Sequence, residues 1–373
     1  MEQSKLYLIA PNYAEAGALE TLPQTSGLHI LKNDNLVQSE LRFNTHDKVC
    51  ITSEASIELV KNRLIDSSKQ KAIDTLKDKY RFREVLTSIY PNYQFKSVAL
   101  DEISKLEVHS NAILKPAKGC FGTAVKLLTP ETNLQTIVQE IDEELQKNAS
   151  VLSSEVLSSN QFILEDYIEG EEYAVDMFYD ANGKPHIVNV YHHPMPKHEA
   201  YLHMIYYSSK AVFERIYDKA MDFFTALNAI LQVKNFTMHS EFRYDGQRLI
   251  PIEINCMRFG GMGLGNMVYH TMGVNPYQCF NTGSSPNWDQ LWNHPEHAQN
   301  VYAFFIAYNG TNVDTQKQQP DIEKLKAQFT QVVQEELFDY QKQLAFGVFS
   351  LKETTDSLQR LLQIDFNDYF KPI

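Results

Sequence analysis

The chain contains few cysteines and no long apolar segment. Its 373 residues include four cysteines, whose spacing fits neither a zinc motif nor a disulfide framework: Cys50, Cys120, Cys256 and Cys279. No apolar run approaches the length that crosses a bilayer, and the run at residues 6–10 is shorter than the core of a signal peptide. We therefore expect a reduced, cytoplasmic protein.

Basic residues are scarce relative to acidic ones. The chain has 34 lysines and arginines against 47 aspartates and glutamates, which gives a formal net charge of −13. Because this excess of negative charge repels phosphate backbones and anionic lipids, we expect no nucleic-acid partner and no membrane partner. The length predicts about two or three domains.

Apolar periodicity predicts several helices and strands. Helical stripes cover residues 71–89 and 211–231, and residues 129–131 have the sequence of a helix start. The Ser-rich residues 150–160 predict a flexible connection. The final ninety or so residues predict two further helices and contain no recognisable motif. Short strands are expected at residues 162–165, 173–180 and 186–192.

The most informative feature that is present is a pair of strand-like runs that carry carboxylates. The run at residues 236–243 carries Glu241, and the run at residues 248–255 ends in Glu253 and Asn255. Magnesium prefers hard oxygen ligands and usually takes one or two carboxylates together with substrate phosphates. The two runs predict a magnesium site if both carboxylates lie on one face of a hairpin.

The connection between the two runs decides that face. Because side chains alternate along a strand, a two-residue turn at residues 245–246 would put Glu241 and Glu253 on opposite faces. A three-residue loop at residues 245–247, with Gly246 left-handed, pairs position 241 with position 251 and puts both carboxylates on one face. We therefore expect an odd loop or a β-bulge in this hairpin.

Two upstream segments offer contacts to a nucleotide. Lys115 lies on an expected strand before a glycine-bearing loop, where an ammonium group and backbone N–H groups can bind phosphate oxygens. This segment is not a Walker P-loop, because its lysine precedes its glycines. The second segment, residues 164–173, is an extended linker that can offer backbone groups to adenine. Taken alone, these segments are more typical of a solvated hairpin and of an acidic loop.

In this order and spacing, the three segments resemble the ATP-grasp superfamily of carboxylate–amine ligases over roughly residues 75–275. The resemblance implies an ATP-grasp fold of the α/β (α+β) class, with two α+β lobes that clasp ATP. A small N-terminal α/β domain is expected at residues 1–76 and a central ATP-grasp lobe at residues 77–165. The C-terminal lobe, at residues 166–373, would carry the metal site and a helical C-terminal extension.

The resemblance also assigns roles by position. It implies that phosphate is bound by Lys79, Lys115, Lys118, Gly119 and Gly122, and adenine and ribose by Glu165, Tyr167, Ile168 and Glu172. It implies that magnesium is bound by Glu241, Glu253 and Asn255. Catalysis is assigned to Arg258 with Lys115. The family pattern Glu-x-Asn-x-Arg is altered, because Arg258 comes one position later than usual. In the glycine loop, Phe121 would cap the site or contact an apolar part of the acceptor.

The implied activity is ATP-dependent ligation of a small carboxylate to an amine through an acyl-phosphate, with release of ADP and phosphate. ATP and Mg²⁺ are the implied cofactors, with Mn²⁺ as an alternative metal, and a homodimer is left open. Two alternatives are a small-molecule kinase or carboxylase-type enzyme and a nucleotide-binding module without catalysis. No biotinyl-lysine motif is visible, which disfavours a self-contained biotin system.

Histidines and tyrosines gather between the hinge and the metal ligands. Five histidines there fit no zinc signature, and we expect them near an acceptor pocket or at the surface: His186, His192, His193, His198 and His203. A polar aromatic wall near that pocket is expected from Tyr191, His193, Tyr201, Tyr206 and Tyr207. His239 shares the expected face of Glu241, where it would orient that carboxylate or form an ordinary hydrogen bond in the core.

Overall fold

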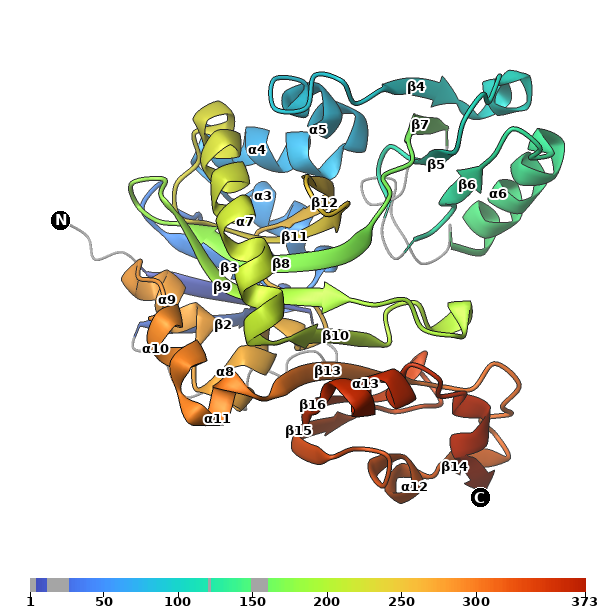
Figure 1. The fold of residues 1–373 in the computed structure, drawn as a ribbon. Helices are drawn as coiled ribbons and strands as arrows, with labels where there is room; N and C mark the ends of the chain where they lie inside the picture. Colours follow the sequence, from blue (N-terminus) through green and yellow to red (C-terminus); the bar gives the residue numbers. More distant parts are fainter. Residues whose placement is uncertain (1–4, 12–26, 120–121, 149–159) are drawn as a thin grey trace.

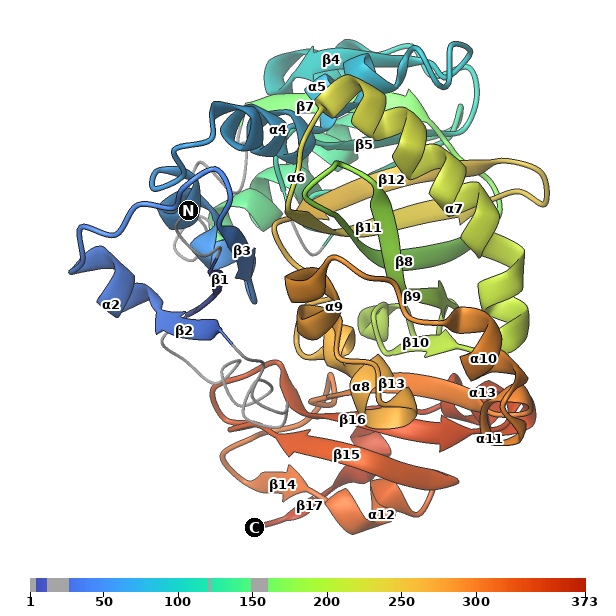
Figure 2. The same cartoon turned by 90° about the vertical axis from the view of Figure 1, so that its left-hand side faces the viewer.

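The computed structural model describes residues 5–11, 27–119, 122–148 and 160–373. Figure 1 shows a small lobe at the upper right and a large sheet that runs from the middle of the molecule down to the C-terminal strands. Figure 2 shows the N-terminal sheet beside the large sheet. Phe121 and residues 150–159 of the predicted flexible connection lie outside the described residues. None of the described helices is both long and apolar enough to cross a bilayer.

The N-terminal unit is a parallel sheet that packs against the large sheet. Its strands, in sheet order, are β2 (Leu28–Lys32), β1 (Leu6–Ala10) and β3 (Lys48–Ile51), with helices α2 (Asn33–Val37), α3 (Ile57–Lys61) and α4 (Ser67–Lys77). β1 is buried along its whole length. Leu6 and Leu8 pack with Phe178, whereas Tyr7 and Ile9 join the principal core. Burial of both faces explains the continuous apolar run of β1.

The helix predicted over residues 71–89 is two helices. α4 ends at Lys77, and α5 (Lys79–Leu86) begins after Asp78. Asp78 has an extended backbone, and its carboxylate accepts hydrogen bonds from two N–H groups in the first turn of α5. This capping interaction starts a new helix, whose first N–H donates to the carbonyl of Ala117 at 2.7 Å. α5 is thereby anchored to the glycine loop.

The central lobe has its own sheet and its own core. Its antiparallel strands, in sheet order, are β4 (Phe95–Ala99), β7 (Gln161–Asp166), β5 (Ala112–Pro116) and β6 (Lys126–Leu128), and α6 (Leu134–Asn148) covers them. Ile141 and Leu145 of α6 are buried in this core, as the apolar stripe predicts. The helix start predicted at residues 129–131 is wrong, because the Asn133 side chain caps α6 by accepting from the N–H groups of Gln135 and Thr136.

The large sheet has eight strands and carries the expected metal ligands at one edge. In sheet order the strands are β12 (Leu249–Cys256), β11 (Phe236–Tyr244), β8 (Glu171–Tyr179), β9 (Pro185–His193), β10 (Ile205–Ser208), β13 (Val301–Tyr308), β16 (Ala345–Glu353) and β15 (Gln331–Leu337). α7 (Lys210–Leu231) lies across one face and buries Ile216, Ala220 and Phe224 (Figure 1). The strands predicted at residues 162–165, 173–180 and 186–192 and the helix at 211–231 are confirmed as β7, β8, β9 and α7.

The end of the chain contributes strands as well as helices. Its helices are α8 (Met267–Met272), α9 (Pro276–Thr282), α10 (Trp288–Asn293), α11 (Pro295–Ala298), α12 (Ile322–Lys326) and α13 (Thr355–Leu361), and β14 (Gln318–Pro320) pairs with β17 (Phe370–Pro372). The helical extension predicted for this region is wrong beyond residue 300, because β13, β16 and β15 complete the large sheet. β13 is an apolar run buried on both faces, and periodicity alone does not separate such a strand from a buried helix.

The domain boundaries predicted after residues 76 and 165 stay predictions. The first falls inside α4 and the second inside β7. The three predicted units nevertheless correspond to separate sheets, because β1–β3, β4–β7 and β8–β13 belong to different sheets.

Candidate active site

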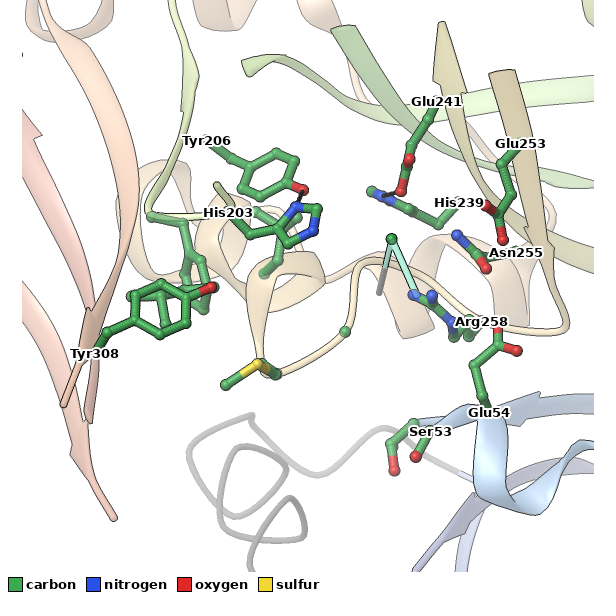
Figure 3. Close-up of a pocket in the computed structure, with 17 residues that line it drawn as sticks. Ser53, Glu54, His203, Tyr206, His239, Glu241, Glu253, Asn255, Arg258 and Tyr308 are labelled. Carbon is green, nitrogen blue, oxygen red and sulfur yellow. Dashed lines mark hydrogen bonds and ion pairs between the residues drawn. The ribbon is translucent and has the colours of Figure 1, made fainter. Parts of the chain in front are cut away.

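The hairpin of β11 and β12 brings the expected metal ligands together. Glu241 pairs directly with Glu253, and His239 pairs directly with Asn255. Side chains of directly paired residues lie on the same face of a sheet. All four residues line one cavity, which Figure 3 shows with Arg258 on the same side.

A β-bulge, and not the loop, sets this register. The connection is four residues long, residues 245–248, so the predicted three-residue loop and the pairing of positions 241 and 251 are wrong. An even loop alone would turn Glu253 to the opposite face from Glu241. The ladder shifts beyond Glu241 and leaves Ile252 as an extra residue, which restores the shared face. The expected bulge is therefore confirmed, as is the positive φ of Gly246, 98°.

The two carboxylates repel each other. Burial raises the pKa of Glu241 to about 7, and the charge of Glu253 adds to that rise. Two basic groups lie near the pair: Lys79 Nζ is 3.4 Å from Glu253 Oε2, and His239 Nε2 is 3.7 Å from Glu241 Oε1. Neither contact has the length of a close ion pair, so negative charge remains directed into the cavity.

A buried aspartate fixes the orientation of His239. Asp176 is fully buried, and its Oδ1 lies 2.8 Å from His239 Nδ1, which leaves Nε2 of the ring facing Glu241. The same carboxylate accepts hydrogen bonds from the Tyr191 hydroxyl at 2.7 Å and from the Gly260 N–H at 2.8 Å. Asp176 thereby ties the metal-ligand strand to the loop that follows Arg258.

Arg258 reaches the cavity despite its shifted position. Met257 has a positive φ of 63°, which breaks the alternation of β12 before Arg258. This turn is held by two backbone hydrogen bonds, because the Met257 N–H donates to Thr237 and its carbonyl accepts from Ile51. The Arg258 side chain lines the same cavity as Glu241 and Glu253 (Figure 3). The extra residue is therefore absorbed in the backbone.

Glu54 of the N-terminal unit is a site residue that the sequence did not reveal. Its Oε1 lies 3.4 Å from Arg258 Nε, and it also forms an ion pair with Lys77. Burial opposes ionisation of Glu54, but the charges of Lys77 and Arg258 outweigh this and lower its pKa to about 2. Ser53 lines the same cavity. No local motif marks these residues, because they reach the site only through packing of the N-terminal sheet.

A second cavity, of 280 Å³, adjoins the first beneath the central lobe. The two cavities share Gly122, His203, Glu241 and Glu253. The second is lined by most of the residues expected to bind ATP, namely Lys79, Lys115, Gly119, Gly122, Glu165, Tyr167, Ile168 and Glu172. Lys118 is not among the lining residues. Sequence reasoning missed further lining residues, which include Val125, Met195, Leu202 and Arg243.

Glu165 is enclosed by cations at the back of this cavity. Its Oε2 lies 2.7 Å from Arg83 Nε, and its Oε1 lies 2.6 Å from Lys115 Nζ. Burial opposes the charge of Glu165, but both cations outweigh it and lower the pKa to about 2. The cations also hold β12, because Arg83 donates to the Pro251 carbonyl at 2.6 Å and Lys115 to the Ile252 carbonyl at 3.4 Å. The central lobe is thus docked on the metal-ligand strand.

The other two polar anchors of this cavity are Lys79 and Glu172. Lys79 Nζ donates to the Gly119 carbonyl at 2.9 Å, which fixes the start of the glycine loop. Glu172 Oε1 lies 2.6 Å from His193 Nδ1, and Glu172 Oε2 lies 3.2 Å from Arg243 Nη2. Burial acts against the charge of Glu172, but these partners hold its pKa below the ordinary value.

The expected aromatic wall is largely wrong. Tyr191 points to Asp176 rather than into a cavity, and Tyr201 belongs to the core of the C-terminal strands. Of the wall residues, Tyr206 lines the first cavity, where its hydroxyl lies 3.0 Å from His203 Nδ1. Strand alternation explains only Tyr207, which lies on the opposite face of β10 from Tyr206, where its hydroxyl contacts His192 Nδ1. Of the five histidines, His203 lines both cavities, and His193 acts through Glu172.

Comparison with known proteins confirms the ATP-grasp resemblance. Residues 108–266 match the family model of the ATP-grasp domain. This segment contains every strand from β5 to β12 and ends just beyond Arg258. It therefore includes the strands that carry the expected metal ligands. The chain therefore contains an ATP-grasp domain. Among curated proteins, none matches the sequence.

Solved structures show the same fold over almost the whole chain. The L-amino acid ligase from Bacillus licheniformis superposes with a TM-score of 0.65 at 14% identity, with coverage of 100% of this chain and 99% of that one. The N5-carboxyaminoimidazole ribonucleotide synthetase from Thermotoga maritima gives 0.62 at 12%, covering 99% of each chain. The phosphoribosylglycinamide synthetase from Anaerococcus prevotii gives 0.56 at 14%, covering 100% of each. These likenesses confirm the predicted fold class.

Proposed function

We propose that the protein is an ATP-dependent, ADP-forming carboxylate–amine ligase that makes an amide or peptide bond between two small molecules. The observation that carries this proposal is the facing pair Glu241 and Glu253 at the junction of two cavities in an ATP-grasp domain. One cavity is lined by most of the residues expected to bind a nucleotide. The other offers a separate compartment for the substrate carboxylate beside Arg258. The L-amino acid ligase and the phosphoribosylglycinamide synthetase of the same fold support this class of reaction.

The donor atoms between the cavities fit a magnesium–nucleotide complex. Over the described parts of the chain, no cluster of three or more His, Cys, Asp or Glu side chains is arranged to hold a metal ion. Magnesium needs less from the protein, because phosphate oxygens and water supply the remaining ligands. Glu241, Glu253 and the Asn255 amide would hold it. A cation there would relieve the repulsion from Glu253 that, after burial, raises the pKa of Glu241. Mn²⁺ accepts the same oxygen donors.

In this proposal basic side chains hold the polyphosphate of ATP and the substrate carboxylate in place. Lys79 and Lys115 bind phosphate oxygens, while the backbone near Tyr167 and Ile168 contacts adenine. The bound metal would supply charge neutralisation on the phosphates. Arg258 directs the substrate carboxylate toward the γ-phosphorus and stabilises the oxygens that gain charge during transfer. Lys118 lies away from the cavity lining, and we assign it no contact.

The two chemical steps conserve atoms and charge within the site. A carboxylate oxygen attacks the γ-phosphorus of ATP, the bond to the β-phosphate oxygen breaks, and ADP leaves. The amine nitrogen then attacks the acyl carbon, phosphate leaves, and the amine loses a proton. Because water would compete with the amine, the acyl-phosphate must form in a shielded compartment. Burial of Lys115 and half-burial of Glu241 beneath the central lobe supply that shielding.

The direct test is ATP turnover with carboxylates and a generic amine. Purified protein is mixed with ATP, Mg²⁺, a carboxylate panel and hydroxylamine, and ADP, phosphate and hydroxamate are measured. Matching amounts of all three products are expected. ADP with a stable phosphorylated product would instead indicate a kinase, and nucleotide binding without turnover an inactive module.

Two isosteric variants make this test specific to the metal ligands. Glu253→Gln should lower kcat/KM by about 100-fold or more, because one ligand of the charge-neutralising metal is lost. Glu323→Gln, at an exposed position of α12, is the matched control and should turn over like the wild type. Similar rates for all three proteins would overturn the proposed role of Glu253.

A further inference from the structure

The cavity beside Arg258 has two chemically different sides. It is small, 170 Å³, compared with roughly 300 Å³ or more for typical drug-sized ligand sites. Figure 3 shows Glu241, Glu253, Asn255 and Arg258 on one side and His203, Tyr206 and Tyr308 on the other. The second side is completed by apolar residues of β13 and of the loop before α8: Phe304, Ile306, Met262 and Leu264.

The apolar side is a wall of the cavity and not only core. β13 alternates, so Phe304 and Ile306 face the cavity while Phe305 packs in the separate core of the C-terminal strands. Met262 and Tyr308 are only half-buried, so the wall remains accessible from the cavity. β13 contributes no charged side chain to this lining.

Two polar side chains on this side of the cavity are already partnered with each other. The Tyr206 hydroxyl lies 3.0 Å from His203 Nδ1, and the Tyr206 ring stacks on His193 with centroids 4.1 Å apart. A charged or hydroxylated group placed against Ile306 would therefore lose its water without gaining a matched hydrogen bond. Burying a polar group in this way is costly, whereas an apolar group gains free energy there.

The opposite side sets the orientation of a bound acid. Arg258 is the only lysine or arginine among the described residues that line this cavity. A carboxylate is therefore attracted to Arg258, next to the Glu241–Glu253 pair where transfer would occur. The rest of the molecule then extends toward β13.

We propose that this cavity selects a carboxylate substrate with an uncharged, apolar body, held by Arg258 at its acid end and by Phe304, Ile306 and Met262 at the other. This inference rests on the proposed ligase function, because it names the substrate class of that reaction. The small volume of the cavity excludes a bulky acid, and its apolar wall excludes a multiply charged one. The amine acceptor is not constrained by this wall.

A substrate screen tests the selection. Butanoate, pentanoate and 4-methylpentanoate are compared with succinate, glutarate and 6-aminohexanoate, each with ATP, Mg²⁺ and hydroxylamine. The apolar acids should give kcat/KM values at least about tenfold higher, which corresponds to about 1.4 kcal/mol of discrimination. Preference for the charged acids would overturn the inference while leaving the ligase function intact.

If no turnover is seen, binding measurements distinguish an inactive protein from a wrong assignment of the pocket. Calorimetry is then done with protein loaded with Mg²⁺ and a non-hydrolysable ATP analogue. Binding of 4-methylpentanoate without turnover would keep the pocket assignment and reject the ligase function. Absence of both binding and turnover would reject the two together.

Two variants of Ile306 report on wall polarity alone. Ile306→Val and Ile306→Thr remove nearly the same volume, and only the threonine adds a hydroxyl. The KM of the preferred apolar acid should be about five- to tenfold higher in Ile306→Thr than in Ile306→Val, because the hydroxyl disfavours an apolar body. The KM for ATP should be equal in both, and thermal melting checks that both are folded. Equal KM values for the acid would contradict the proposal.

Discussion

Glu165 and Glu241 are two shielded carboxylates at neighbouring ends of the site, and their surroundings are opposite. Glu165 touches two cations, Arg83 and Lys115, and its pKa falls to about 2. Glu241 faces another carboxylate, and its pKa rises to about 7. The charge of Glu165 is neutralised by the protein itself, whereas the charge of Glu241 remains to be neutralised by a bound ligand.

This difference separates the part of the site that holds the fold from the part that performs chemistry. The cations around Glu165 also bind carbonyls of β12, so the cluster fastens the central lobe to the large sheet. The Glu241–Glu253 pair has only the longer contacts to Lys79 and His239, and we expect it to destabilise the protein when both carboxylates are ionised. Functional groups are commonly maintained at such a cost in stability.

The largest expected effect is loss of stability on neutralising Glu165. Glu165→Gln leaves the buried cations Arg83 and Lys115 without a counter-charge, and breaking a buried ion pair costs about 3–5 kcal/mol. Chemical denaturation should show this loss, and hydrogen exchange should locate it in β5 and β7. Glu84→Gln, at an exposed position of the same helix as Arg83, is the matched control. A loss below about 1 kcal/mol would mean that the cluster does not fasten the lobe.

Neutralising Glu241 is expected to raise the stability of the protein, whereas neutralising Glu165 lowers it. Its folded pKa, about 7, lies above its ordinary value of 4.5, so the folded state binds the proton more tightly than the unfolded state. Stability of the wild type is therefore lost as pH rises from about 4.5 through about 7. Glu241→Gln cannot ionise and should be more stable than the wild type by about 1–3 kcal/mol at pH 8, with no difference near pH 4.

Melting curves in EDTA across pH 4 to 8 measure this difference. The control Glu323→Gln should follow the wild type at every pH, because its side chain is exposed. Adding Mg²⁺ and an ATP analogue at pH 8 should stabilise the wild type and not Glu241→Gln. A variant less stable than the wild type at pH 8 would contradict the repulsion between Glu241 and Glu253.

The same contrast shows what the sequence can and cannot predict. A shared metal ion requires that Glu241 and Glu253 lie on one face of the hairpin. Because side chains alternate along a strand, an odd loop or a bulge could be predicted from the number of residues between them. The position of the extra residue could not, because Ile252 has no sequence signature of a bulge and its carbonyl is held by Lys115 from another lobe. Long-range contacts of this kind are invisible in local patterns.

Arg258 and Glu54 illustrate two further limits. The shift of Arg258 is absorbed by a left-handed Met257, a conformation rarely adopted by a residue with a bulky side chain. Glu54 enters the site only because the N-terminal sheet packs against β8 and β9. The continuous apolar run of β13 fits a strand buried on both faces, but periodicity alone does not separate such a strand from a buried helix.

The smallest expected effect concerns Asp176, which acts on the metal ligands only through His239. Asp176→Asn keeps the size of the side chain but removes the charge that fixes the His239 ring, so Nε2 is no longer held toward Glu241. We expect about a tenfold rise in the Mg²⁺ concentration needed for half-maximal turnover, with the KM for ATP at saturating Mg²⁺ nearly unchanged. Asp222→Asn, on α7 away from both cavity linings, is the matched control. A variant with normal Mg²⁺ dependence but a lowered melting temperature would show that Asp176 serves packing alone. The small size of the expected effect follows from the position of Asp176, which neither neutralises a cation, as Glu165 does, nor faces the ligand, as Glu241 does.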